Sequence, residues 1–236
     1  MNHIIVDERI SEKCERSLLI KGFNLIKLPK DKDLGEAVCS HPDTVMFCYD
    51  NEIITTADYC DMAAYIFSDL REFLPEIKIT FTADKRSNRY PQDCIMNALV
   101  IGKKIFCKTD SVSDAIIDFA KRRGYEIIHV NQGYPACTTL AFGNNAITAD
   151  RGMAKILSAE GINVSLIRDG HILLPPHKYG FIGGAAGVYK DKVYFFGDLR
   201  YHPDGEFIAC IIRKAGFEVV CLCDEPLSDF GGFIAP

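Results

Sequence analysis

A glycine followed by alternating β-forming residues recurs along the chain, each time directly after a helix-like stretch. It occurs in four segments: 22–26, 124–128, 161–164 and 216–220. A glycine at positive φ ends a helix and leads straight into a strand, because it lacks the Cβ atom that penalises this conformation. In a fifth, variant copy, 75–79, Pro75 stops the helix instead. The pattern predicts five helix-to-strand connections.

Two further marks accompany these copies. A β-run that ends in an aspartate precedes each helix, at Asp7, Asp58, Asp110, Asp150 and Asp198. An aspartate at the start of a helix caps free N–H groups and meets the positive end of the helix dipole, and we predict this role for all five. A hairpin turn lies before four of the runs, at 50–51, 102–103, 143–144 and 190–191. Each repeat of about 47 residues therefore predicts the order strand, turn, strand, helix, strand.

The repeats predict one closed domain, 1–236. Three strands and one amphipathic helix are too few to close a core, so we expect five units stacked around an axis to bury both faces of each sheet. The expected units are 229–236 plus 1–30, 43–82, 93–130, 137–168 and 180–223. In the split unit the strand near the C-terminus pairs with N-terminal elements and closes the ring. The predicted fold class is α/β, a five-bladed α/β propeller.

Composition and charge exclude several classes of protein. Hydrophobic residues make up 48% of the 236 residues and charged residues 25%, ordinary globular values that rule out intrinsic disorder. The net charge of −5, without a lysine- or arginine-rich run, argues against a nucleic-acid partner. No apolar stretch approaches the roughly 18 residues of a membrane span, and the acidic start does not resemble a signal peptide. We therefore expect a cytoplasmic protein that binds no membrane.

The ten cysteines do not indicate disulfides or a metal. Most lie inside apolar runs, as Cys48, Cys107 and Cys210 do, where reduced thiols act as small buried hydrophobes. Cys221 and Cys223 lack the two-residue spacing of a redox or zinc motif, and no second Cys/His pair stands at a zinc-ligand distance. We therefore expect no metal and no cofactor.

Five strand-strand-helix-strand units closed by joining the termini resemble the pentein fold. That fold houses the guanidine-group-modifying enzymes, which include arginine deiminase, dimethylarginine hydrolase, agmatine deiminase and the amidinotransferases. It also houses a eukaryotic ribosome anti-association factor, which is not an enzyme. The resemblance implies chemistry around one mouth of a central channel, where a cysteine thiolate attacks the guanidinium carbon, carboxylates hold its nitrogens and a histidine moves protons. Within this superfamily the chain looks most like a compact bacterial branch without the usual C-terminal catalytic cysteine.

The segment 91–97 resembles the family's Arg-Asp segment, which leads into a strand and a glycine turn. Asp93 falls on the substrate-binding aspartate, while Gln92 replaces the usual arginine. An ordinary surface aspartate before a strand is the alternative. Cys94 opens the same strand and is a further candidate for substrate binding, with a buried structural thiol as its alternative.

The segment 131–137 stands where the family has a Glu-Gly-Gly-Asp-like segment. A glycine is kept, but both acids are missing, and Asn131 and Gln132 supply amides instead. Neutral amides cannot offset a buried positive charge, so a neutral ureido, amide or amino-acid ligand would fit better than guanidinium. A turn held by the Asn and Gln side chains is the alternative. Cys137 opens the next strand and is a candidate either for a relocated nucleophile or for a buried structural thiol.

The last candidates come from the fourth unit and the C-terminus. His177 lies near the position of the family's histidine, and His171 is a second candidate. The Gly-Gly step that precedes the family's nucleophile is present at 231–232, after Asp229, but no Cys, Ser or Thr follows it. The ordinary thiolate mechanism is therefore not expected.

Two hypotheses follow for function. The first is a small-molecule site at the channel mouth, formed by Asp93, Asn131, Cys137, His177 and Asp229. It would serve binding or an altered C–N bond chemistry of the hydrolase or amidinotransferase type. The second is a non-enzymatic scaffold or protein-interaction module, which would have a filled channel and an exposed apolar patch.

Overall fold

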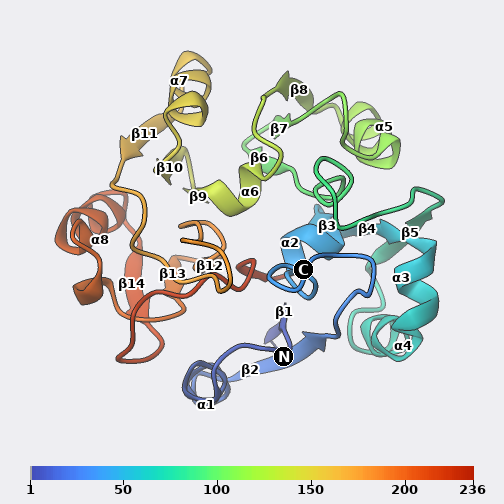
Figure 1. Cartoon of the computed structure of the whole chain (residues 1–236), viewed down its shortest axis with the longest axis horizontal. Coiled ribbons are helices and arrows are strands. Elements are labelled where there is room, and N and C mark those ends of the chain that lie inside the picture. The colour runs from blue at the N-terminus through green and yellow to red at the C-terminus, as the bar shows by residue number, and fades with distance from the viewer. Residues whose placement is uncertain (1) are drawn as a thin grey trace.

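Five small sheets form a ring. The computed structural model describes residues 2–236, and Figure 1 shows the sheets arranged around a common centre with most of the helices at the periphery. Each sheet has three strands, with the following bounds in spatial order: β15 (Phe233–Ile234), β1 (Asn2–Asp7) and β2 (Phe23–Leu28); β3 (Met46–Tyr49), β4 (Glu52–Thr56) and β5 (Lys78–Thr82); β6 (Leu99–Ile101), β7 (Lys104–Cys107) and β8 (Glu126–His129); β9 (Thr139–Phe142), β10 (Asn145–Thr148) and β11 (Asn163–Leu166); β12 (Ala186–Tyr189), β13 (Lys192–Phe195) and β14 (Glu218–Cys221).

The strand order is the predicted one in every sheet. The middle strand pairs antiparallel with the first strand and parallel with the third. β15 lies beside β1, with Ile234 opposite Ile5 and Phe233 opposite Val6, so the C-terminal strand closes the ring. The prediction of a five-bladed α/β propeller made of strand-strand-helix-strand repeats is confirmed.

The helices mostly follow the repeats. Their bounds are α1 (Glu12–Ile20), α2 (Pro42–Val45), α3 (Ala57–Met62), α4 (Ala64–Phe73), α5 (Asp114–Arg123), α6 (Pro135–Thr138), α7 (Arg151–Ala159), the 3-10 helix η1 (Leu199–Tyr201) and α8 (Gly205–Lys214). One helix was expected between β4 and β5, but Ala63, at φ −111° and ψ 34°, leaves the helical conformation and divides it into α3 and α4. The one-turn helices α2 and α6 were not expected, and both lie at the centre of the ring (Figure 1).

The two kinds of helix boundary differ in how well they were predicted. The four glycines after the helices all have positive φ: Gly22, Gly124, Gly161 and Gly216. Asp150 and Asp198 accept hydrogen bonds from the first turns of α7 and η1, as expected of caps. The other three aspartates do not cap their helices, because hydroxyl side chains do so: Ser11, Thr56 and Ser113. Asp58 still lies in the first turn of α3, near the positive end of the helix dipole as expected.

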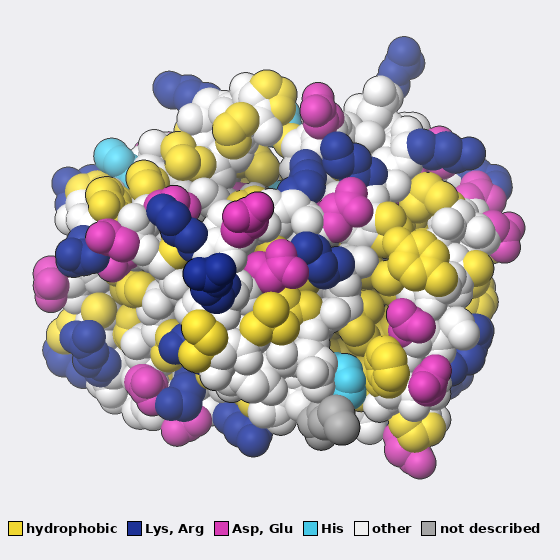
Figure 2. Space-filling model, turned by 90° about the horizontal axis from the view of Figure 1, so that it is seen from below, with side chains coloured by type: hydrophobic (Ala, Val, Ile, Leu, Met, Phe, Trp, Pro, Cys, Tyr) yellow, Lys and Arg dark blue, Asp and Glu magenta, His cyan; other side chains and the backbone are white. Residues whose placement is uncertain are grey.

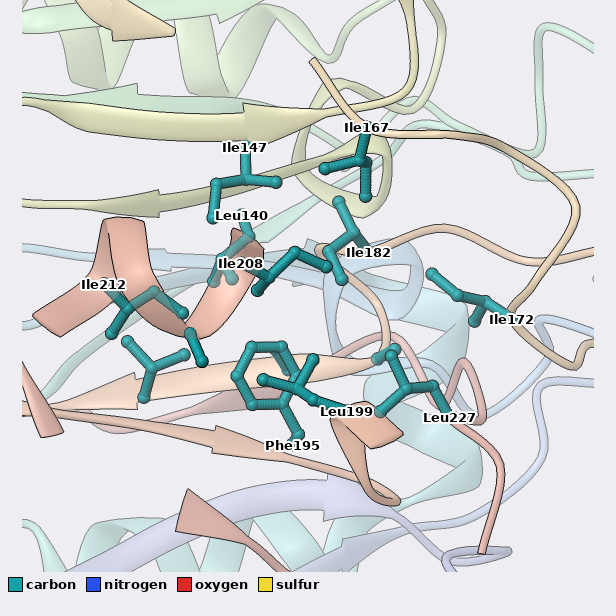
Figure 3. Close-up of a cluster of buried hydrophobic side chains, with 14 of the residues drawn as sticks. Leu140, Ile147, Ile167, Ile172, Ile182, Phe195, Leu199, Ile208, Ile212 and Leu227 are labelled. Carbon is teal, nitrogen blue, oxygen red and sulfur yellow. The ribbon is translucent and has the colours of Figure 1, made fainter. Parts of the chain in front are cut away.

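Hydrophobic clusters between neighbouring blades hold the ring together. In the cluster drawn in Figure 3, Leu140 and Ile147 of the fourth blade pack with Phe195 and Ile208 of the fifth. Each of these side chains is at most 3% exposed. Burying such a side chain contributes about 1.5–3 kcal/mol, so each of these contacts across the blade boundary helps to hold the ring together.

Close backbone packing explains Gly183, which lies three residues before β12. A Cβ atom at Gly183 would overlap the carbonyl oxygen of Ala136 and lie 2.7 Å from that of Cys137. We expect Gly183→Ala to lower the free energy of unfolding by about 1–3 kcal/mol, because two backbone segments would have to separate. Urea denaturation measures the effect. Gly35→Ala is the matched control, since a Cβ there meets no atom within 4 Å. Equal stabilities for the two variants would contradict the explanation.

The surface mixes charges of both signs. In Figure 2 lysine and arginine side chains alternate with acidic ones, and apolar side chains gather toward one side of the view. Among residues 2–236, no helix is long and apolar enough to cross a membrane.

Candidate functional site

A cavity of about 580 Å³ opens at one mouth of the ring. Its walls come from the loop 35–38, from the segment 174–181 and from side chains that precede the first strands. A second cavity, of about 280 Å³, runs between the first strands themselves, with Asp43 in its lining. Asp43 contacts Cys137, which lines the larger cavity. The two side chains therefore lie where the two cavities approach each other.

Two equivalent one-turn helices place these side chains. α2 and α6 both begin with a proline, whose fixed φ suits the first helical position, and both lead directly into a first strand. The same threonine contact anchors each of them: Thr55 donates to the carbonyl of Val45 at 2.6 Å, and Thr148 to that of Thr138 at 2.8 Å. The repeat thus brings α2 and α6 to corresponding positions around the channel.

Cys137 lies in a buried hydrogen-bond network. Its thiol donates to Asp43 Oδ2 at 2.5 Å, and Asn97 Nδ2 lies 3.3 Å from its sulfur. Asn97 also donates to the carbonyl of Asp43 at 3.0 Å and accepts from the N–H of Ala136 at 2.8 Å. Asn97 therefore fixes the carboxyl-bearing and the thiol-bearing segments relative to each other.

His41 lies between two carboxyl groups. Its Nε2 is 3.8 Å from Asp7 Oδ2 and its Nδ1 is 3.7 Å from Asp229 Oδ1, both beyond hydrogen-bond distance. Arg9 holds Asp7 with its backbone N–H, 2.7 Å from Oδ1, and with its guanidinium, whose Nε lies 2.9 Å from Oδ1 and whose Nη2 lies 2.6 Å from Oδ2. Asp229 accepts from the N–H groups of Phe181 and Gly231 at 2.9 and 3.0 Å. Both carboxyl groups are thus held in place beside a histidine that is 1% exposed.

Burial favours the uncharged forms of these groups. It lowers the pKa of His41 to about 4 and raises the pKa of Asp43 to about 8. It also raises the pKa of Asp229, and it raises the pKa of the Cys137 thiol well above its ordinary value. An entering cation would reverse part of this effect, because a nearby opposite charge stabilises carboxylate and thiolate. The cluster is therefore suited to a positively charged ligand.

Four of the residues predicted for the site line the larger cavity: Asp93, Cys137, His177 and Asp229. The Oδ1 atom of Asp93 is buried there and has no hydrogen-bond partner within the described residues. His177 is exposed at the rim.

The other two predicted residues do not line this cavity. Cys94 donates its thiol to the carbonyl of Pro91 at 3.2 Å and packs against Gly133. Asn131 is exposed, and its Oδ1 lies 3.3 Å from His129 Nε2. The structure therefore does not bring Cys94 or Asn131 to the channel mouth.

Sequence reasoning missed His41, Asp43 and Asn97, and it interpreted Asp7 only as a helix cap. A signal was present, because His41 and Asp43 stand two residues apart directly before a first strand, where site residues were expected in other units. The contact of Asp43 with Cys137 spans 94 residues of sequence, so only the closed ring reveals it.

A comparison with protein families decides where the chain belongs. One family model matches residues 5–234, almost the whole length. The chain belongs to this family of unknown function, DUF6873. A comparison of the DUF6873 chain with curated proteins finds no match.

Solved structures share the fold of the DUF6873 chain at low sequence identity. Dimethylarginine dimethylaminohydrolase from Pseudomonas aeruginosa, a mutant in complex with citrulline, is 12% identical, with a TM-score of 0.58 over 93% of this chain and 91% of that one. The inosamine-phosphate amidinotransferase of Streptomyces griseus is 11% identical, with a TM-score of 0.57 over 100% and 93%. The agmatine deiminase of C. jejuni is 8% identical, with a TM-score of 0.56 over 94% and 87%. These similarities establish the pentein fold.

Proposed function

We propose that the protein breaks a C–N bond of a small guanidinium or amidinium compound, with Cys137 as the nucleophile. The observation that carries the proposal is the Cys137 thiol, hydrogen-bonded to Asp43 at the inner end of a cavity large enough for such a ligand. Some of the proteins that share this fold act on guanidinium compounds, which supports this choice of substrate class. The nucleophile would lie before the first strand of the fourth sheet instead of after the C-terminal Gly-Gly step, where Phe233 stands.

The carboxyl groups of the site support a cationic ligand, because an entering positive charge would favour their ionised forms. The sequence favoured a neutral one, because the segment 131–137 lacks acids. Carboxyl groups from other units, Asp43 and Asp229, take over that role beside the cavity, and Asp93 adds a third. Carboxylates form paired, charge-assisted hydrogen bonds with guanidinium and amidinium nitrogens. A bound cation would also lower the pKa of the thiol and so activate it.

The proposed reaction has two halves. In the first, Asp43 takes the proton of the Cys137 thiol, the sulfur bonds to the central carbon and the C–N bond to the leaving amine breaks. The proton that Asp43 took from the thiol passes to the leaving amine through His41, which lies within 4.8 Å of Asp43 and Cys137. His41 is neutral at physiological pH, so it can accept this proton on one ring nitrogen and then give it to the amine. In the second half, water or an acceptor amine attacks the same carbon, the C–S bond breaks and the thiol recovers its proton.

A thermal-shift panel tests the proposal with arginine, agmatine, acetamidine and the neutral citrulline. We expect a cationic member to stabilise the protein by about 2.7 kcal/mol at about 100 times its dissociation constant, and to release amine on incubation. Asp229→Asn should weaken the shift, whereas Asp118→Asn, on the exposed side of α5, should not. A silent panel, or equal shifts in both variants, would favour a non-enzymatic scaffold instead.

The scaffold alternative expected a filled channel. The cavity of about 280 Å³ between the first strands argues against it. The exposed apolar side chains of Tyr65 and Phe73, at 58% and 45%, favour the scaffold alternative.

A further inference from the structure

We propose that His41, Asp43 and Cys137 form a binding site for a divalent transition-metal ion of the zinc class. One ligand atom from each residue lies within 4.8 Å of the other two. The sequence contains no zinc motif because the ligands come from two segments that are 94 residues apart, α2 with its preceding residue and α6. Closure of the ring brings them together.

Unpartnered atoms point to a missing ligand. Nδ1 and Nε2 of His41 and Oδ1 of Asp43 are buried, and none of them has a hydrogen-bond partner among residues 2–236. A buried polar atom without a partner costs about 1–3 kcal/mol, so three of them in one cluster call for a counterpart. A metal ion bound by one ring nitrogen of His41 and by Asp43 Oδ1 would partner two of the three atoms.

The donor set selects the kind of ion. Thiolate and imidazole favour zinc and its neighbours over calcium or magnesium, which prefer oxygen ligands. Three protein ligands with a free fourth position match the pattern of open zinc sites. His41 and Cys137 line the cavity of about 580 Å³, so water or a ligand could take that position.

The surroundings of His41 suit a metal ligand. A metal-bound histidine commonly gives its other ring N–H to a carboxylate, which orients the ring. Asp7 lies 3.8 Å from one ring nitrogen and Asp229 lies 3.7 Å from the other. A carboxyl group is therefore close to the free nitrogen whichever of the two binds the ion.

The site would also regulate the proposed function. An ion on the Cys137 sulfur withdraws the nucleophile, so zinc and an amidinium ligand would exclude each other. This consequence rests on the proposed function, whereas metal binding itself does not, and direct binding measurements separate the two.

Zinc titration of the full, chelator-treated chain in competition with a chromophoric chelator tests the site. We expect one zinc ion per chain with a submicromolar dissociation constant. Cobalt should give a sulfur-to-metal charge-transfer band. Cys137→Ser should abolish the band. It should also weaken zinc binding more than the loss of a residue that only supports a ligand, which costs about 10- to 100-fold. Cys60→Ser, a half-buried thiol of α3, is the matched control and should retain both.

Two further measurements guard against misfolding and misassignment. Asp43→Asn removes a ligand oxygen while leaving every cysteine in place, and it should also weaken zinc binding; thermal unfolding establishes that each variant is folded. Absence of stoichiometric zinc binding by the unmodified chain would overturn the proposal. Unchanged affinity in folded Cys137→Ser and Asp43→Asn variants would overturn it equally.

Discussion

Replacing Cys137 by serine is expected to lower the rate of C–N bond cleavage by about 10³-fold or more, the range seen when a catalytic nucleophile is lost. A hydroxyl has a far higher pKa than a thiol, so Asp43 could not generate the nucleophile. The substitution is nearly isosteric, and the new hydroxyl can still donate to Asp43, so the fold and ligand affinity should persist. The measurement is kcat for amine release with the strongest ligand of the panel.

Mass spectrometry provides a second readout of the same prediction. A slow substrate should add its amidino group to the peptide that contains Cys137, and the serine variant should carry no such adduct. Cys60→Ser should keep both the rate and the adduct. Full activity of the Cys137→Ser variant would place the nucleophile elsewhere.

The fold was predictable because its signals are local and repeated. The glycines that end α1, α5, α7 and α8 each stand between a helix and a strand, and the hairpin turns mark the strands before the helices. A repeated unit cannot close its own core, so a closed ring is expected because it buries both faces of every sheet. The break at Ala63 carries no comparable signal, since alanine is the best helix former.

The site was predictable only where the repeat points to it. One rule is that residues before the first strands converge at the channel mouth. Within it, family motifs selected Asp93 and Asp229, and Cys137 was selected as the residue that opens a strand; all three line the larger cavity. The rule applies equally to His41 and Asp43, but family motifs directed attention to other units. The shifted pKa values of His41 and Asp43 result from burial in the closed ring, and no local pattern in the sequence reports it.

Replacing Arg86 by methionine is expected to lower the free energy of unfolding by about 3–5 kcal/mol, the cost of leaving a buried charge without its partner. Arg86 Nη2 lies 2.6 Å from Asp31 Oδ2, and both side chains are at most 5% exposed. The same guanidinium donates to the carbonyl of Val45 at 2.6 Å and to Thr56 Oγ1 at 2.9 Å. Arg86 therefore joins the C-terminal end of α2 to the loop that contains Asp31, and α2 also carries Asp43.

Lys85 provides the control, because its ion pair with Asp58 is largely exposed. Lys85→Met should cost at most about 1 kcal/mol, as surface pairs do. Adding Asp31→Asn to Arg86→Met removes the stranded carboxylate and should restore part of the stability, which a double-mutant cycle by urea denaturation measures. If Arg86→Met cost no more than Lys85→Met, the buried ion pair would not hold α2 in place. Asp43 would then be held by Asn97 and by the contact of Thr55 with Val45.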